Sequence, residues 1–307
     1  DVILGNGSGQ PIDMICDVLL NPGDVVITDS FVYGGTLNTL RRHFTDIRGV
    51  PSDESGMDPE ALDKEIEKAI KADHKPKFVY LIPSFQNPQG WTIPESRRKE
   101  LLAVTEKYGV PILEDDCYAD NRYDGDLPTS IFNLDDTNSV MYVGSFSKII
   151  APGMSLGYMT APQLILDRAM GVKSGRVSEF TAMAVEKYAR KYLDAHIEEI
   201  NNIQRTKRDA MLSALGENFG TGAKWSDPDG GLYIWVKLKE GSDMVALNKR
   251  SVEEIDVGFH PGINYSPDGT SGKDHIRLCY GYNQPDEITE GISRLANFLS
   301  KEGALDS

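Results

Sequence analysis

Apolar residues along the first half of the chain follow two alternating patterns. Short, continuous apolar runs are typical of buried strands, and segments with apolar residues at every third or fourth position are typical of amphipathic helices. The predicted strands are 2–4, 25–28, 47–50, 78–82, 110–113, 140–143 and 156–160, and the predicted helices are 11–20, 36–44, 59–72 and 94–108. This alternation predicts an α/β fold, with a mostly parallel sheet between two layers of helices.

The pattern changes after residue 160. Two long helices are predicted over 179–192 and 195–215, and then strands over 232–238, 257–259 and 275–279 and a closing helix over 286–299. We interpret this part as a smaller α+β domain. The chain of 307 residues is long enough for two domains, which we place at residues 1–193 (large) and 194–307 (small, C-terminal).

Charge and cysteine content narrow the class of protein. Acidic side chains outnumber basic ones by 47 to 32, and the net charge of −15 argues against nucleic-acid binding by this part of the chain. The three cysteines lack CxxC spacing and the histidines lack metal-ligand spacing, so we expect free thiols in a reducing compartment and no metal site. No apolar run is long enough to span a membrane, and we expect a soluble, cytoplasmic protein. Because the chain starts at Asp1 without an initiator Met, we also expect that an N-terminal segment is missing.

One lysine stands at the end of a predicted buried strand. The strand 140–143 leads directly into Gly144-Ser145-Phe146-Ser147-Lys148. An open α/β sheet binds its ligands at the carboxyl ends of its strands, so Lys148 is expected beside a cleft. An amine that is partly removed from water is suited to forming a Schiff base with a carbonyl, although an ordinary surface lysine explains the pentapeptide equally well.

Two loops that follow predicted strands carry further candidate groups. The loop Gly5-Asn6-Gly7-Ser8-Gly9-Gln10 lies between a strand and a helix, where backbone N–H groups bind phosphate; a plain tight turn is the alternative. The loop 83–90 follows another strand and is expected to expose the amide of Asn87; an ordinary Asn-Pro turn is the alternative.

Charged and aromatic residues complete the set of candidates. Glu114, Asp115 and Asp116 end an apolar strand, where repulsion and desolvation require a cationic partner, either a metal ion or a protonated ring nitrogen. Arg277 lies within another apolar strand and needs an anion, either in a structural ion pair or on a substrate carboxylate. Tyr33 begins a helix, where it either covers a ring or packs in the core.

These clusters occur in the order found in a known family. The chain resembles, over nearly its whole length, the fold-type I, class I/II aminotransferases that use pyridoxal phosphate, through Ser145-Phe146-Ser147-Lys148, Asn87-Pro88-Gln89-Gly90, Asp115 with Tyr118, Tyr33 and Arg277. The stretch 52–56 and the Glu-Asp-Asp run are similar to the branch of aminoadipate and kynurenine aminotransferases. The resemblance implies a homodimeric enzyme that exchanges an amino group between an L-amino acid and a 2-oxo acid.

The resemblance also implies roles in catalysis. Lys148 would form a Schiff base with the cofactor and then move a proton as general base and acid. Asp115 would keep the pyridine nitrogen protonated, so that the ring withdraws electrons. Tyr118 and Asn87 would hydrogen-bond the phenolic oxygen of the cofactor.

The remaining implied roles concern binding. Tyr33 would stack on the ring, and Arg277, together with Asn87, would bind the substrate and hold its carboxylate. The phosphate would be held by small residues of two loops, namely Gly7, Ser8, Gly9, Ser145 and Ser147.

One position departs from the family pattern. Members of the family usually carry a phosphate-binding arginine seven residues after the lysine, and here that residue is Ser155. The loss should cost about 1.5 to 3 kcal/mol of cofactor binding unless Arg168, Lys173 or Arg176 takes the place of that arginine. Ser155 therefore leaves open a pyridoxal-phosphate enzyme that catalyses elimination, replacement or carbon–carbon bond formation. A transcription regulator with an aminotransferase-like ligand sensor is another alternative, because its DNA-binding module would lie outside these residues.

Overall fold

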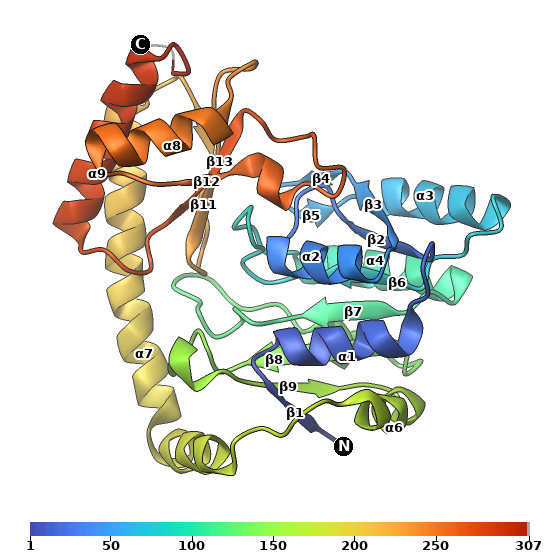
Figure 1. Ribbon diagram of the computed structural model, residues 1–307. Helices are drawn as coiled ribbons and strands as arrows, with labels where there is room; N and C mark the ends of the chain where they lie inside the picture. The colour runs from blue at the N-terminus through green and yellow to red at the C-terminus, as the bar shows by residue number, and fades with distance from the viewer. Residues whose placement is uncertain (306–307) are drawn as a thin grey trace.

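The computed structural model describes residues 1–305, and its largest feature is a seven-stranded sheet (Figure 1). Its strands, in spatial order, are β1 (Ile3–Asn6), β9 (Leu156–Thr160), β8 (Val140–Ser145), β7 (Ile112–Asp115), β6 (Phe78–Leu81), β2 (Val25–Asp29) and β3 (Asp46–Val50). The five strands from β8 to β3 pair in parallel, and β9 runs antiparallel to both of its neighbours. A short hairpin of β4 (Ser52–Asp53) and β5 (Gly56–Met57) follows β3.

Helices cover both faces of the large sheet, because its strands are apolar on both sides. Val26, Tyr80 and Met141 belong to the hydrophobic core on one face of the sheet. Val79 and Ile112 belong to the core on the opposite face. The helices on the first face are α1 (Gly9–Leu19), α2 (Gly34–Arg42) and α6 (Gln163–Val172), and those on the second are α3 (Pro59–Lys71), α4 (Glu95–Tyr108) and α5 (Ile131–Leu134). This three-layer arrangement confirms the predicted α/β fold.

The second sheet is antiparallel and has four strands. Its spatial order is β10 (Lys224–Trp225), β11 (Tyr233–Lys237), β13 (His275–Cys279) and β12 (His260–Pro261). The core of this part contains residues from the sheet and from three helices, α7 (Glu179–Asn218), α8 (Met244–Ile255) and α9 (Pro285–Lys301). The predicted domain boundary between residues 193 and 194 falls inside α7, and the division into two domains stays a prediction.

The helix α7 runs along one side of the molecule, past the edge of the large sheet and up to the small sheet (Figure 1). The prediction of two helices, 179–192 and 195–215, was wrong, because the 40 residues of α7 form a single helix. No proline lies between residues 179 and 218, so nothing in this stretch removes a helical N–H group. Within residues 1–305, no helix, α7 included, combines the length and the apolar character needed to cross a membrane.

The strand predicted over 257–259 was also wrong, since β12 begins only at His260. The hydroxyl of Ser251 donates to the carbonyl of Val257 at 2.7 Å, and the N–H of Phe259 donates to the side chain of Asn248 at 2.9 Å. Side chains of α8 therefore bind the backbone groups that a neighbouring strand would otherwise bind. The helices α6 and α8 were not predicted.

A buried arginine connects α4 to the loop that follows β6. Arg98 is fully buried, and its Nε donates to the carbonyl of Ile93 at 2.8 Å. Its Nη2 donates to the carbonyl of Pro83 at 3.0 Å and to the hydroxyl of Ser84 at 3.1 Å. Because Pro83 and Ser84 begin the loop that carries Asn87, Arg98 fixes where that loop leaves the sheet.

We expect the Arg98→Met variant to lose about 3 kcal/mol of unfolding free energy, because the carbonyl groups of Ile93 and Pro83 would stay buried without a donor. Urea denaturation followed by circular dichroism measures this loss. Arg97→Met is the matched control, since Arg97 pairs at 2.9 Å with the exposed Asp53 and its loss should cost less than about 1 kcal/mol. Equal losses in the two variants would contradict the role given to Arg98.

Candidate active site

The carboxyl ends of β1, β2, β6, β7 and β8 lie at one edge of the large sheet. The loops after these strands surround a cavity of about 260 Å³. Nine of the eleven predicted site residues line it, namely Gly7, Ser8, Gly9, Tyr33, Asp115, Tyr118, Ser145, Ser147 and Lys148. The cavity is also lined by residues that the sequence patterns did not single out as ligand-binding, namely Asn6, Ile82, Cys117 and Tyr233.

The turn from β1 into α1 brings backbone N–H groups to the cavity. Ser8 is the N-cap residue of α1, its side chain does not cap the helix, and the first turn holds no acidic residue. The positive end of the helix dipole is therefore not neutralised from within the helix. The backbone of the turn packs directly against Gly157 of β9. A side chain at residue 157 would prevent this contact, because its Cβ atom would lie 2.4 Å from the carbonyl carbon of Gly7. This side of the cavity is suited to a phosphate.

Lys148 stands in the cavity wall just after β8 and is half-buried. The N–H of Ser147 donates to the hydroxyl of Ser145 at 3.2 Å. The side-chain amide of Asn121 donates to the carbonyl of Lys148 at 3.1 Å. Hydrogen bonds therefore fix the backbone on both sides of the Lys148 side chain, at the N–H of Ser147 and at the carbonyl of Lys148.

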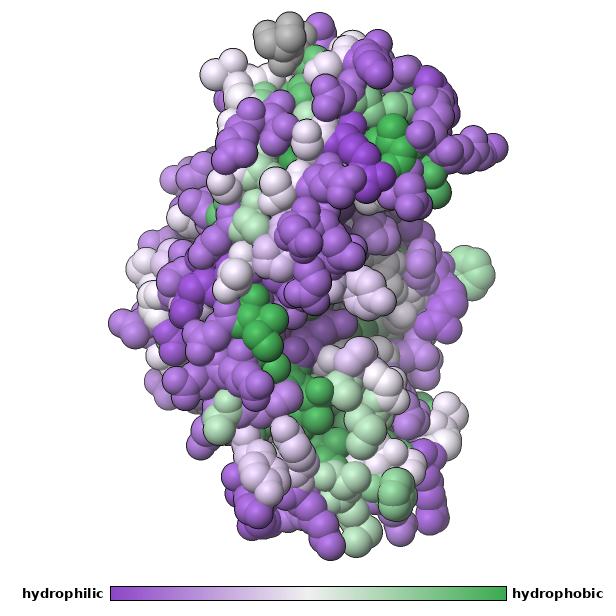
Figure 2. Space-filling view, turned by 90° about the vertical axis from the view of Figure 1, so that its left-hand side faces the viewer, coloured by the Kyte–Doolittle hydropathy of each residue, from purple (hydrophilic) through white to green (hydrophobic). Residues whose placement is uncertain are grey.

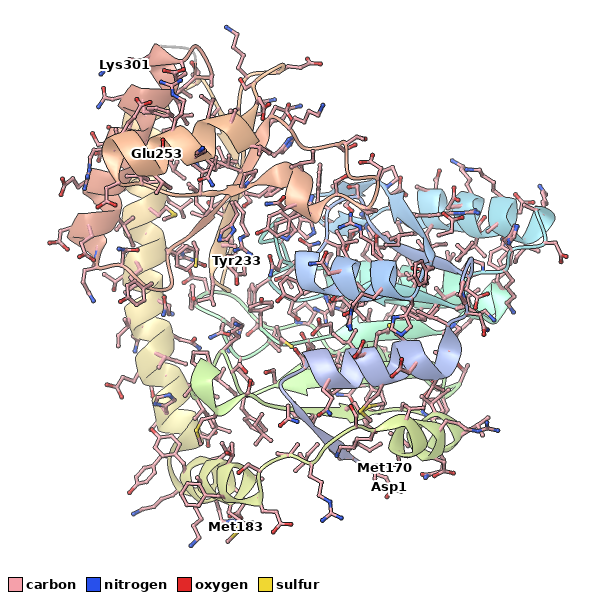
Figure 3. The ribbon with its side chains drawn as sticks, viewed as in Figure 1. Asp1, Met170, Met183, Tyr233, Glu253 and Lys301 are labelled. Atoms are coloured by element: carbon pink, nitrogen blue, oxygen red, sulfur yellow. The ribbon has the colours of Figure 1, made fainter. Side chains whose placement is uncertain are left out.

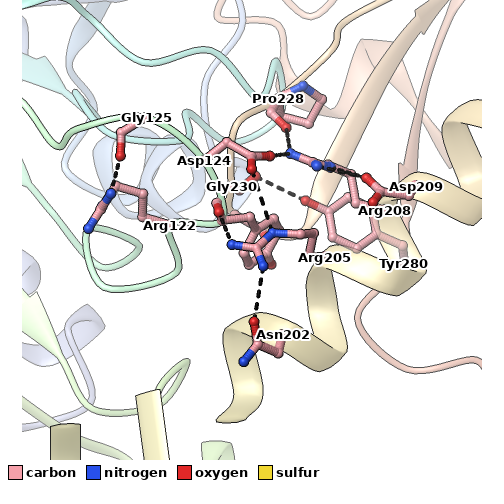
Figure 4. A network of polar contacts seen from close by, with 12 residues as sticks. Arg122, Asp124, Gly125, Asn202, Arg205, Arg208, Asp209, Pro228, Gly230 and Tyr280 are labelled. Carbon is pink, nitrogen blue, oxygen red and sulfur yellow. Dashed lines mark hydrogen bonds and ion pairs between the residues drawn. The ribbon is translucent and has the colours of Figure 1, made fainter. Parts of the chain in front are cut away.

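The loop 119–125, which carries Asn121, is bound to α7 by a polar network (Figure 4). Arg208 of α7 forms an ion pair of 2.7 Å with Asp124 and donates to the carbonyl of Pro228 at 3.0 Å. Asn201, about two turns before Arg208 on the same face of α7, donates to the carbonyl of Asp120 at 2.8 Å. The long helix thus supports the cavity indirectly, through the loop that holds the backbone of Lys148.

The three carboxylates at the end of β7 have different surroundings. Glu114 accepts hydrogen bonds from the backbone N–H groups of Ile131 (2.9 Å) and Phe132 (2.7 Å), and burial raises its pKa to about 8. Burial also raises the pKa of Asp116. Of the three, only Asp115 lines the cavity. In the part of the chain that the structure describes, no group of three or more His, Cys, Asp or Glu side chains is placed to hold a metal ion.

Polar contacts connect the cavity to the small sheet. The amide of Asn87 donates to the hydroxyl of Tyr118 at 3.2 Å, and its Oδ1 accepts from Nη1 of Arg277 at 2.9 Å. The prediction of an exposed Asn87 was wrong, because these contacts enclose the side chain and leave it 1% exposed. Asn87 and Arg277 do not line the cavity itself but adjoin it through Tyr118.

Arg277 is a buried cation without an acidic partner among residues 1–305. It is 8% exposed, its Nε has no hydrogen-bond partner there, and none of the described ion pairs includes it. Its guanidinium carbon lies 4.0 Å from the ring centre of Tyr233 and 5.1 Å from that of Tyr265. Tyr233 stands at the end of the small sheet that faces the large one (Figure 3). Because a buried charge requires a counter-charge, this position is suited to the carboxylate of a ligand.

Ser155 lines the cavity at the position where the family pattern has an arginine. Its carbonyl accepts from the N–H of Gly7 at 2.5 Å, so its backbone is bonded to the turn between β1 and α1. None of the three suggested substitutes lines the cavity: Lys173 donates to the carbonyl of Leu4 at 2.9 Å, and Arg168 and Arg176 are exposed.

Groups suited to a phosphate, to a ring nitrogen and to an aldehyde meet in one cavity, and this combination defines a pyridoxal-phosphate-dependent enzyme of fold type I. The residues present fit the cofactor, since Asp115 is a buried carboxylate beside the cavity and the turn at Gly7 is open to a phosphate. Residues 1–295 match the family model for aminotransferase class I and II. The chain belongs to this family, and its function is pyridoxal-phosphate-dependent amino-group transfer.

Three relatives illustrate the similarity. Aromatic-amino-acid aminotransferase 1 of Thermococcus litoralis is 35% identical over 306 residues, which cover 98% of this chain and 73% of that protein. The 2-aminoadipate transaminase of Thermus thermophilus is 30% identical over 305 residues, which cover 97% and 75%. The crystal structure of kynurenine aminotransferase from Pyrococcus horikoshii matches with a TM-score of 0.93 and 36% identity, over 98% of this chain and 75% of that one. These matches confirm the resemblance read from the sequence.

A more distant relative belongs to another class. The uncharacterised HTH-type transcriptional regulator YisV of Bacillus subtilis is 28% identical over 301 residues, which cover 96% of this chain and 60% of that protein.

We expect the Ser155→Arg variant to bind pyridoxal phosphate about tenfold more tightly, because a guanidinium adds a charge-assisted hydrogen bond to the phosphate. Equilibrium titration of the apoprotein with the cofactor measures the affinity. Ser300→Arg is the control, since it adds the same charge at an exposed position of α9. Unchanged or weaker binding by Ser155→Arg would show that another cation already satisfies the phosphate.

Proposed function

We propose that this protein exchanges an amino group between an L-amino acid and a 2-oxo acid, and that Lys148 is its covalent and proton-transferring residue. The observation that carries the proposal is that Lys148 and Asp115 line one cavity, with the unpaired Arg277 adjoining it. When bound, the cofactor supplies an aldehyde that reacts with amines and a ring that withdraws electrons.

The cofactor-binding residues act at three places. Gly7, Ser8 and Gly9, at the start of α1, hold the phosphate together with the hydroxyl groups of Ser145 and Ser147. Asp115 keeps a proton on the ring nitrogen, and Tyr33 covers the ring. The ring of Tyr33 lies over Gly35, where a Cβ atom would come within 2.4 Å of it.

Tyr118 donates to the phenolic oxygen of the cofactor, and Asn87, predicted as a second donor, acts behind it through its bond to the Tyr118 hydroxyl. The hydroxyl of Tyr118 accepts from Asn87 and also shares a hydrogen bond with the hydroxyl of Tyr233, so the bound cofactor would take the Tyr118 proton in place of Tyr233. Burial raises the pKa of Tyr118 well above its ordinary value, which keeps the hydroxyl protonated. Tyr118 is therefore protonated, and able to donate, at neutral pH.

Substrate orientation depends on Arg277. Asn87 fixes one nitrogen of the guanidinium, and the rings of Tyr233 and Tyr265 lie against it, so a substrate carboxylate meets a cation with little remaining freedom. With the carboxylate held there, the amine of Lys148 would take the proton from the α-carbon of the substrate and deliver it to the cofactor carbon that carried the aldehyde.

Ser155 favours a second candidate function within the same class of cofactor. A cavity without the usual phosphate-binding arginine, and without a substitute from Arg168, Lys173 or Arg176, suits specialised chemistry such as elimination, replacement or carbon–carbon bond formation. These reactions release ammonia, a leaving group or a longer carbon chain, whereas amino-group exchange releases a 2-oxo acid.

The similarity to YisV keeps the ligand-sensing domain of a transcription regulator as a third candidate. Such a domain would bind a ligand in this cavity and work with a DNA-binding module. Sequence-specific DNA binding without amino-group exchange would favour this candidate over an enzyme.

We expect the Lys148→Ala variant to lose amino-group exchange by about 10³-fold or more, because no other amine replaces it as proton carrier. The wild type should show visible absorbance from the bound cofactor, which changes on adding aromatic amino acids, kynurenine or 2-aminoadipate and returns on adding 2-oxoglutarate. Lys107→Ala, which removes a surface ion pair with Asp63 and a contact with the ring of Tyr108, should behave as the wild type. A colourless wild type would contradict all cofactor-dependent candidates, and release of ammonia would favour the second.

We further infer that the protein is a homodimer. Exposed apolar side chains gather at the start of α7 and on α6, including Phe180 (83% exposed), Met183 (59%) and Met170 (56%). Met170 and Met183 lie on the same side of the molecule (Figure 3), and apolar surface is visible on the face that α7 forms (Figure 2). Exposed apolar groups of this kind mark interfaces between subunits.

We expect sedimentation velocity to give about twice the chain mass of 33.9 kDa for the wild type. A Phe180→Glu, Met183→Glu variant should sediment closer to the monomer mass, because burying two carboxylates in an interface is unfavourable. Ile203→Glu, an exposed apolar residue further along α7, serves as the control. A monomeric wild type would refute the inference.

We also infer a cytoplasmic location. The three cysteines are free thiols, and two of them, Cys16 and Cys117, are buried, as suits a reducing compartment. Recovery of the native protein from a membrane or extracellular fraction would contradict this location.

A further inference from the structure

The carboxylate of Asp115 is held by two donors that the sequence patterns did not single out. The hydroxyl of Tyr80 donates to Oδ2 at 2.5 Å, and the thiol of Cys117 donates to Oδ1 at 2.8 Å. Each carboxylate oxygen thus has its own donor. Tyr80 is fully buried and Cys117 is 8% exposed, so neither bond competes freely with water.

A third residue extends these contacts to α2. The hydroxyl of Thr36 donates to the hydroxyl of Tyr80 at 3.0 Å, and Thr36 is itself buried. Because the Tyr80 oxygen accepts one bond while it donates another, the bond that it gives to Asp115 is strengthened. Tyr33, the residue placed to cover the cofactor ring, is the N-cap residue of the same helix.

The two donors favour the ionised form of Asp115. Burial raises the pKa of Asp115, whereas the hydrogen bonds from Cys117 and Tyr80 and the charge of Lys148 lower it. Burial also raises the pKa of the Tyr80 phenol and of the Cys117 thiol, so both groups keep the proton that they donate. The other titratable groups that interact with Asp115 are Asp116 and Tyr118.

We propose that Tyr80 and Cys117 are positioning residues that keep Asp115 ionised and oriented toward the cavity. They thereby keep the proton on the ring nitrogen of the bound cofactor. The proposal rests on the role proposed above for Asp115. A proton shared by two bases stays on the more basic one, and a carboxylate that accepts two hydrogen bonds is less basic than a free one. Without these donors the proton moves from the ring to the carboxyl group, and the ring loses the charge that makes it withdraw electrons.

The direct test uses holoenzyme reconstituted with pyridoxal phosphate that carries ¹⁵N at the ring nitrogen. The ¹⁵N NMR chemical shift of the ring nitrogen reports whether it is protonated. In the wild type this shift should be that of a protonated ring nitrogen, and in Tyr80→Phe and Cys117→Ala it should move toward that of a neutral one. We expect kcat to fall about tenfold in each variant, as for the loss of a hydrogen bond to a charged group, with KM changed by less than about twofold.

Matched variants separate this role from a structural one. Cys117→Ser keeps a donor beside Asp115 and should restore the protonated ring signal, and Thr36→Val should give a smaller shift than Tyr80→Phe. Tyr280→Phe removes a fully buried hydroxyl that donates to the carbonyl of Gly230 at 2.9 Å, and Cys16→Ala removes a fully buried thiol of α1. Neither control should move the signal.

A second measurement on the apoprotein makes the proposal testable without the cofactor. With ¹³C-labelled aspartate and Asp115→Asn for assignment, the pKa of Asp115 should be higher in Tyr80→Phe and Cys117→Ala than in the wild type, because the lost donors stabilise the ionised form. An unchanged Asp115 titration in both variants overturns the proposal, as does an unchanged ring signal.

The two proposals fail in different ways. If the wild type does not bind pyridoxal phosphate, the proposed function fails, whereas the Asp115 titration still tests the two donors. If Tyr80→Phe does not fold, the comparison of Cys117→Ala with Cys117→Ser decides, since the two variants differ mainly in the donor next to Asp115.

Discussion

The parallel pairing of β6, β7 and β8 is the constraint on which the active site depends. Parallel strands all end at the same edge of a sheet, so the groups that follow them meet although they are far apart in the sequence. Asp115 ends β7, and Lys148 follows β8 by three residues. The antiparallel β9 returns between β8 and β1, and its Gly157 lets the turn at Gly7 lie against the strand, which brings the start of α1 to the same cavity.

The second sheet completes a site that the first cannot form alone. The large sheet supplies groups for the cofactor, whereas the buried cation that suits a carboxylate, Arg277, comes from β13. The bond between Arg277 and Asn87 joins the two sheets, and α7 connects them along the chain while its Arg208 and Asn201 hold the loop next to Lys148. Movement of the small sheet relative to the large one would therefore change the distance between the cofactor and the substrate carboxylate.

Buried ionisable side chains in this protein differ in their hydrogen-bond partners, and the difference matches their roles in structure or in ligand binding. Arg98 is surrounded by carbonyl groups and Glu114 by backbone N–H groups, which satisfy them with no ligand and make them structural. Asp115 is bound by two donors yet still lines the cavity, and Arg277 keeps a nitrogen without a partner among residues 1–305. A buried cation that keeps an unpaired nitrogen beside the cavity, as Arg277 does, is suited to bind an anionic ligand.

The sequence by itself determined the layers of the large sheet and the order of the candidate residues, because the apolar period and the strand-end motifs are local properties. Lys148, the run from Glu114 to Asp116 and the turn at Gly7 were placed at strand ends in this way, and Asp115 was singled out within the run only by the resemblance to the family. It did not show that only one of three adjacent carboxylates lines the cavity, nor that residues 179–218 form a single helix. Above all, the tertiary structure decided the long-range contacts. Asn87 meets Arg277 across 190 positions of the chain, and Tyr80 reaches Asp115 across 35. No local pattern encodes such pairs, since they depend on how strands pair and how the two sheets pack.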